Sequence, residues 1–247
     1  MTSWIFLSPH LDDAVYSCGG LIRDRVDAGN AVAVWTVFAG DPPDGGLSAY
    51  AESLHERWGV GRQAAVRRRA EDVLACGLVG AGFRHFERPD CIYRGDPESG
   101  EALYQSDEAI FGEPAAVEAD RLVRALAREW EEMLPPGARV VSPLGLGGHV
   151  DHRLVRRAAE RLARELWYYA DAPYVFEREE EINARLPVGA EEARFPVSAS
   201  GFEAWMRANA AYESQLSSFW GSVEEMEGEF REYLERAGEL RLWRAKS

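Results

Sequence analysis

Lysine is almost absent from this chain of 247 residues. Of its 28 basic residues only Lys246 is a lysine, and all the others are arginines. A Schiff-base mechanism needs a lysine amine held in a site. A phosphate-binding P-loop needs the lysine of its Gly-Lys-Ser/Thr sequence. Neither chemistry is therefore expected of this protein.

Cysteines and long apolar runs are also scarce. Cys18, Cys76 and Cys91 are widely spaced and form no Cys-x-x-Cys pair, which excludes a zinc ribbon or a redox dithiol. No apolar run approaches the roughly 18 residues of a membrane-spanning helix. The N-terminus lacks the basic start and apolar middle of a signal peptide. We therefore expect a cytoplasmic protein with no membrane partner.

Acidic residues outnumber basic ones, and the formal net charge is −14. Binding to nucleic acid requires a basic surface, so a neutral or cationic small molecule is the better expected partner. The length suits one large α/β domain. We expect residues 1–247 to form a single domain whose C-terminal portion, about 198–247, is helical and less regular. A homo-oligomer remains possible.

Short apolar runs alternate with segments of helical periodicity along most of the chain. Predicted strands are 4–7, 31–38, 82–86, 138–143, 172–176 and 240–243, and predicted helices are 14–28, 63–76, 115–133, 151–167, 201–220 and 222–237. This alternation predicts a Rossmann-like three-layer αβα fold with a mainly parallel sheet. In such folds ligands bind beyond the carboxyl ends of the strands.

Two polar clusters each follow a predicted strand, and the first is Ser8-Pro9-His10-Leu11-Asp12-Asp13. His10 and Asp13 are three residues apart in a turn, so both can point at one metal ion. Asp12 then points to the open side of the metal and can remove a proton from water. The alternative is that Asp12 and Asp13 only cap the following helix and that His10 lies in a surface loop.

The second cluster is Gly147-Gly148-His149-Val150-Asp151-His152, at a predicted helix start. Either histidine can bind a metal, and we interpret His152 as the one on the inward face. Two imidazoles and one carboxylate on Zn²⁺ leave a position open for water. His149 would hydrogen-bond a substrate carbonyl oxygen, and Asp151 would orient that imidazole. The alternative is a polar helix start with two exposed histidines.

The remaining two histidines are not expected in the site. His55 lies in a polar stretch and is expected to be exposed, whereas His85 lies within a strand pattern and is expected to pack.

The two clusters resemble the motifs of the PIG-L/LmbE family of zinc-dependent deacetylases, which remove the acetyl group from N-acetylglucosamine-type sugars. The first family motif is similar to His-Pro-Asp-Asp-Glu, here His10 to Ala14, and the second to His-x-Asp-His, here His149 to His152. Further similarity lies in Arg68-x-x-Glu71, in Pro89-Asp90 and in Tyr212-Glu213-Ser214-Gln215. The resemblance thus covers nearly the whole chain.

The resemblance implies that His10, Asp13 and His152 bind zinc, or another divalent transition metal, and that Asp12 is the general base. The implied reaction is hydrolysis of the acetamide of an N-acetylglucosamine-type sugar conjugate, which releases acetate and a free amine. The metal polarises the carbonyl and activates water, and Asp12 takes the water's proton.

The resemblance also implies that His149 and Asp151 assist at the carbonyl and that Arg68 and Asp90 hold sugar hydroxyls. For Arg68 the alternative is a solvated helix surface, and for Asp90 it is a turn residue after proline.

Two departures from the first motif concern its proline, here Leu11, and its final glutamate, here Ala14. Neither position is expected to bind the metal, so hydrolysis is still expected, but substrate preference is less defined. Two other functions remain open. One is an inactive sugar-binding protein of the same fold, and the other is a different metallohydrolase, which would usually need more carboxylates for a two-metal centre.

Overall fold

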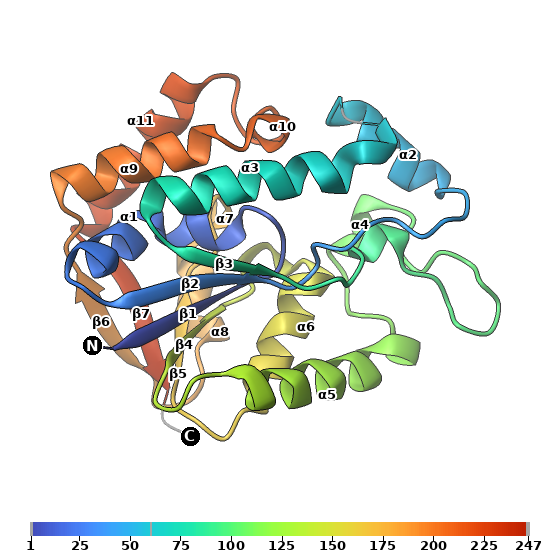
Figure 1. The fold of residues 1–247 in the computed structure, drawn as a ribbon, viewed down its shortest axis with the longest axis horizontal. Coiled ribbons are helices and arrows are strands. Elements are labelled where there is room, and N and C mark those ends of the chain that lie inside the picture. Colours follow the sequence, from blue (N-terminus) through green and yellow to red (C-terminus); the bar gives the residue numbers. More distant parts are fainter. Residues whose placement is uncertain (1, 60, 246–247) are drawn as a thin grey trace.

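A computed structural model describes residues 2–59 and 61–245, so Lys246 lies outside the described residues. In that part of the chain seven strands form one sheet with the order β3-β2-β1-β4-β5-β7-β6 (Figure 1). Strands β1 to β5 are parallel, whereas β7 is antiparallel to both β5 and β6. The strands are Ser3–Ser8, Ala31–Thr36, Gly82–His85, Arg139–Pro143, Leu166–Tyr169, Glu191–Phe195 and Leu240–Ala245, numbered β1 to β7.

Helices cover both faces of the sheet and make the three layers visible in Figure 1. One face is covered by α1, α3 and α9, which pack on one another, and the opposite face by α5 and α6. Their bounds are Asp13–Asp27 for α1, Ala64–Val79 for α3, Ala199–Ala210 for α9, Ala116–Met133 for α5 and Val150–Ala159 for α6. The predicted three-layer α/β fold is therefore confirmed.

The shorter elements lie around this framework. They include α2 (Ala49–Arg57) and α4 (Asp107–Ile110) near the carboxyl ends of the parallel strands, and α10 (Glu213–Leu216) and α11 (Val223–Ala237) on the side of α3 and α9 (Figure 1). The others are α7 (Tyr174–Glu177), α8 (Ile182–Arg185) and four 3₁₀ turns: Gly61–Gln63, Cys91–Tyr93, Leu146–Gly148 and Glu179–Glu181.

The continuous apolar character of the central strands has a direct packing reason. Every residue of β1 from Trp4 to Ser8 is buried, because helices cover both of its faces. Helix α5 instead buries a single stripe that includes Val123, Leu126 and Trp130. Such a stripe is what a helix with solvent on its outer side requires.

One predicted strand is wrong. Residues 172–176 do not form a strand, because the strand is β5, Leu166–Tyr169, and α7 begins at Tyr174. The helix predicted to reach Trp167 ends at Ala159. All four residues of β5 are buried, so its sequence shows no alternation that would separate it from the end of a buried helix.

The C-terminal portion also differs from the prediction. The helix expected over 201–220 is divided into α9 and α10, and β6 was not expected as a strand. Helix α11 and strand β7 agree with their predicted positions. Among the described residues, no helix combines the length and apolar character needed to cross a bilayer.

Candidate metal-dependent active site

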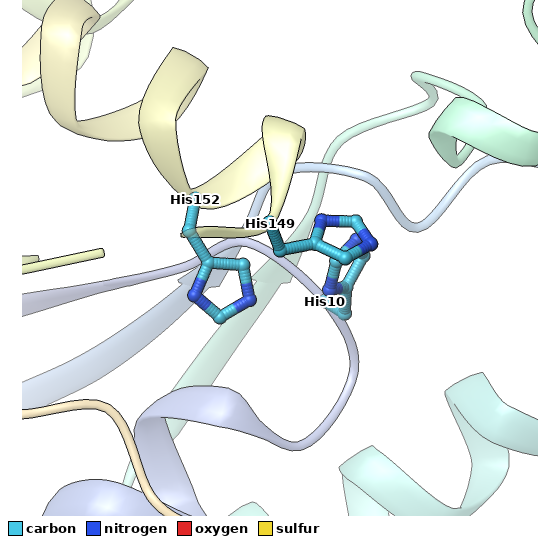
Figure 2. Close-up of side chains that lie close together, drawn as sticks. All are labelled: His10, His149 and His152. Carbon is cyan, nitrogen blue, oxygen red and sulfur yellow. The ribbon is translucent and has the colours of Figure 1, made fainter. Parts of the chain in front are cut away.

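The two polar clusters meet at the carboxyl edge of the parallel strands. His10 comes from the loop between β1 and α1, while His149 and His152 lie at the start of α6, which follows β4 (Figure 2). Nitrogen atoms of these three buried imidazoles lie within 4.8 Å of one another. Segments more than a hundred residues apart therefore supply one group of potential metal ligands.

Asp13 connects two of these imidazoles. One carboxylate oxygen, Oδ2, lies 3.3 Å from His10 Nδ1, and the other, Oδ1, lies 3.3 Å from His152 Nε2. In a tetrahedral zinc site with ligand bonds of roughly 2.0–2.2 Å, neighbouring ligand atoms are separated by roughly 3.3–3.6 Å. The donor types of these three residues, two imidazoles and one carboxylate, therefore fit a divalent metal such as zinc, and each oxygen of Asp13 lies at ligand–ligand spacing from one of the imidazoles.

His152 is oriented from behind by Asp171. Its Nδ1 lies 2.7 Å from Asp171 Oδ1, while Asp171 Oδ2 accepts hydrogen bonds from the backbone N–H groups of Gly145 and Leu146. A carboxylate can only accept, so Nδ1 donates and Nε2 is turned toward Asp13. Burial alone would lower the pKa of His152, but the carboxylates of Asp13 and Asp171 raise it to about 10. The two carboxylates around His152 therefore favour a positive charge at this position.

His10 has an equivalent partner in Asp151. Its Nε2 lies 3.0 Å from Asp151 Oδ2, which leaves Nδ1 facing Asp13. The sequence suggested instead that Asp151 orients His149, but the hydrogen bond from Asp151 to that ring comes from its backbone N–H, at 3.2 Å from Nδ1, and not from its carboxylate. The carboxylate contacts therefore favour an orienting role of Asp151 toward His10.

His149 is arranged as a neutral hydrogen-bond donor. Its Nδ1 accepts the backbone N–H of Asp151, so the ring proton lies on Nε2, 3.9 Å from Cys91 Sγ. Burial and the neighbouring His10 lower the pKa of His149 to about 3. His149 lines the cavity of this site, and a neutral imidazole N–H that reaches a substrate there can stabilise negative charge on a carbonyl oxygen.

Asp12 lines the same cavity but is not one of the three expected ligands. Burial and the charge of Asp13 raise the pKa of Asp12 to about 7, although Arg68, 3.5 Å away, counteracts this increase. A carboxyl group that titrates near neutrality suits a general base. A cation bound nearby would act in the same direction as Arg68 and lower the pKa of Asp12, because it favours the carboxylate form.

A cavity of about 280 Å³ opens onto these residues. Of the predicted site residues only Asp151 does not line it, because Asp151 is fully buried behind the cavity wall. The cavity is lined by His10, Asp12, Asp13, Arg68, Asp90, His149 and His152, with aromatic walls from Trp58, Phe111, Tyr174 and Phe219. The structure therefore brings seven of the eight predicted residues to one cavity.

The guanidinium of Arg68 is buried, but its contacts with carboxylates are long. Its nearest carboxylate oxygens are 3.5 Å away on Asp12 and 3.9 Å away on Asp90, and its Nε has no hydrogen-bond partner. Trp58 lies beside the guanidinium, at 5.3 Å. Because buried polar groups are normally satisfied, this arrangement leaves donors available for a ligand.

The prediction for His55 is wrong, whereas His85 packs as expected. His55 is only 3% exposed, and its Nε2 lies 2.5 Å from the hydroxyl of Tyr93. It is buried because α2 folds over the 3₁₀ turn Cys91–Tyr93, a contact that the local polarity of the sequence does not reveal. His85 binds Asp72 at 2.7 Å.

Sequence reasoning missed two residues that hold the side chains of the site in place, Asp171 and Arg94. Asp171 follows β5 by two residues, a position where polar groups face the site, but the strand itself was predicted in the wrong place. Arg94 directly follows the 3₁₀ turn Cys91–Tyr93, outside every strand and helix predicted from the sequence. Its guanidinium binds Asp151 at 2.6 Å and both carboxylate oxygens of Glu118.

The comparisons identify the family. Residues 5–163 match the model described as PIG-L, GlcNAc-PI de-N-acetylase, so the chain belongs to this family. The resemblance seen in the sequence is thereby confirmed.

Two curated relatives are 2'-N-acetylparomamine deacetylases. The protein of Niallia circulans is 28% identical over 196 residues, which are 70% of this chain and 67% of the relative. The protein of Streptomyces fradiae is 31% identical over 182 residues, 71% of this chain but only 58% of the relative.

Solved structures support the fold over the full length. The zinc-inhibited form of the teicoplanin deacetylase Orf2 has a TM-score of 0.85 and 26% identity, and covers 100% of this chain and 99% of that one. The A40926 pseudoaglycone deacetylase Dbv21 has a TM-score of 0.81 and 28% identity, with 99% and 98% covered. All four of these proteins are deacetylases by name.

Proposed function

We propose that this protein is a metal-dependent deacetylase that hydrolyses the acetamide of an N-acetylglucosamine-type sugar conjugate and releases acetate and a free amine. The observation that carries the proposal is the placement of Asp13 between His10 Nδ1 and His152 Nε2, with Asp12 at the same cavity. Membership of the PIG-L family and the deacetylase relatives support the same activity.

His10, Asp13 and His152 would hold the metal, with zinc the expected ion because of its two imidazoles and one carboxylate. When bound, a divalent metal polarises the acetamide carbonyl and makes water a stronger nucleophile at neutral pH. Asp151 and Asp171 keep the ligating nitrogens of the two histidines turned toward Asp13.

The reacting groups of the substrate would meet two further side chains. Asp12 accepts a proton from the attacking water, and the Nε2–H of His149 donates a hydrogen bond to the oxygen that becomes negative on attack. Asp12, which has taken the water's proton, then returns it to the amine nitrogen as the carbon–nitrogen bond breaks. Arg68 and Asp90, which line the same cavity, would bind sugar hydroxyls.

The size of the cavity bears on the substrate. Its volume, about 280 Å³, lies at the lower limit of the roughly 300–1,000 Å³ common for ligand pockets. One acetylated sugar ring is therefore expected inside, with the rest of the conjugate outside. The relatives named for paromamine and teicoplanin make antibiotic sugar conjugates the first substrates to try.

The deciding experiment measures acetate release from a panel of N-acetylglucosamine conjugates, before and after treatment with a chelator and after zinc is restored. We expect release that the chelator abolishes and zinc recovers. Metal-loaded protein that binds these sugars but releases no acetate would instead support the inactive sugar-binding alternative. The single domain, the cytoplasmic location, the absence of nucleic-acid and membrane partners, and a homo-oligomer stay predictions.

A further inference from the structure

Asp151 belongs to two overlapping sets of potential metal ligands. Besides the three imidazoles, potential ligand atoms of Cys91, His149 and Asp151 lie within 4.8 Å of one another, and so do those of His10, Asp90 and Asp151. A thiolate, an imidazole and a carboxylate are all good zinc ligands. The set with Cys91 would use His149, which the proposed mechanism needs as a free hydrogen-bond donor.

The carboxylate of Asp151 is fully engaged in the structure. Its Oδ1 lies 2.6 Å from an Arg94 nitrogen, while its Oδ2 accepts the backbone N–H of Cys91 at 3.1 Å and faces His10 Nε2 at 3.0 Å. Asp151 itself is completely buried. With these contacts in place, neither oxygen is free to turn toward a metal.

Arg94 is fixed in turn by a buried acid. Glu118 binds the guanidinium with both oxygens, at 2.9 and 3.1 Å, and accepts the hydroxyl of Tyr104 at 2.7 Å. All three side chains are at most 9% exposed. A bidentate arginine–carboxylate pair gives both strength and geometric definition, so the guanidinium is held in one orientation against Asp151.

From this arrangement we propose that Arg94 is a positioning residue that selects the metal-binding set. It holds Asp151 against His10, and so keeps the ion on His10, Asp13 and His152 rather than on Cys91, His149 and Asp151. The inference rests on the metal site proposed above.

Electrostatics gives the physical reason. Without Arg94, the buried Asp151 would keep His10 Nε2 and the backbone N–H of Cys91 as partners, but the charge of its Oδ1 would lose its arginine, which is costly in a dry interior. A nearby divalent cation would then be its natural partner. The Cys91 thiol would join by losing its proton to solvent, since coordination to a metal deprotonates a thiol. The ion would then bind His149 and would no longer be held by His10, Asp13 and His152.

Cobalt(II) in place of zinc reports directly on thiolate coordination, because sulfur bound to cobalt produces a charge-transfer absorption band. We expect no such band in the cobalt-loaded wild-type protein. Arg94→Met should produce the band, and the double variant Arg94→Met/Cys91→Ser should lose it again. Acetate release by Arg94→Met should fall as well, with metal affinity for the original set reduced roughly 10–100-fold, as for other groups that orient ligands.

Two further variants make the test independent of folding defects. Arg94→Met leaves Glu118 buried and unpaired, so Arg94→Met/Glu118→Gln removes the whole pair. Arg94→Lys keeps a positive charge near Asp151 and should show little or no band. Folding of each variant is checked by near-ultraviolet circular dichroism.

The outcomes separate the two proposals. A folded Arg94→Met/Glu118→Gln protein with wild-type metal affinity and no thiolate band would overturn the role of Arg94 but leave the deacetylase proposal intact. A wild-type protein that binds neither zinc nor cobalt would contradict both. A band already present in the wild-type protein would show that Arg94 does not exclude Cys91.

Discussion

The Nδ1 of His152 lies 2.7 Å from Asp171 Oδ1, and both residues are almost completely buried. This contact fixes which nitrogen of the imidazole faces Asp13, and Asp171 is itself fixed by two backbone N–H groups of the glycine-rich turn after β4. A residue after one strand thus orients an imidazole, the proposed ligand His152, that follows the neighbouring strand.

The first prediction concerns this pair. Asp171→Ala should lower zinc affinity roughly 10–100-fold, because the ring of His152 loses the group that orients it and raises its basicity. Competition with a chromogenic chelator measures the affinity. A folded Asp171→Ala protein with wild-type zinc affinity would contradict the orienting role.

The second prediction tests the general base. Asp12→Ala should still bind one zinc ion per chain, since Asp12 is not among the proposed ligands, but its turnover should fall roughly 10²–10⁴-fold. Metal content and acetate release are measured on the same preparation. Unchanged turnover would remove Asp12 from the mechanism, and loss of the metal would make it a ligand.

The third prediction distinguishes the two histidines of α6. His152→Ala should lose the metal, whereas His149→Ala should keep it and lose mainly turnover, because the Nε2 of His152 faces Asp13 at 3.3 Å while the Nε2 of His149 lies 3.9 Å from Cys91 Sγ. Zinc per chain, determined by elemental analysis after dialysis, decides between them. The assignment is reversed if His149→Ala is the variant found without metal.

The fourth prediction concerns stability without the metal. A ligand that binds only the folded chain stabilises it by about 2.7 kcal/mol at a free concentration one hundred times its Kd. Zinc should therefore raise the melting temperature of chelator-treated protein, and His152→Ala should show little of this increase. An equal increase in both proteins would place the stabilising ion elsewhere.

Much of the framework could be predicted because its signals are local. Apolar runs such as Trp4–Leu7 and Val140–Val141 are buried on both faces, and helical periodicity identified most of the covering helices. The strand β5 escaped because a short buried run has no periodicity of its own. The edge strand β6 escaped because it is largely charged and exposed.

The residues of the site also fall into those that the sequence revealed and those that it did not. His10, Asp12, Asp13 and the cluster from His149 to His152 were recognisable because each group is compact in sequence and follows a strand. The sequence did not reveal which carboxylate orients which imidazole. Asp151 contacts His10 across 141 positions of the chain, and Asp171 contacts His152 across 19.

The sequence by itself determined the chemistry available: imidazoles and carboxylates at strand ends, and no lysine for covalent catalysis within the described residues. Only the tertiary structure decided how these groups divide between holding a metal, moving a proton and orienting one another. The reason is that hydrogen bonds and ion pairs act over about 3 Å, and distances of that size between remote residues exist only once the sheet has brought its loops to one edge.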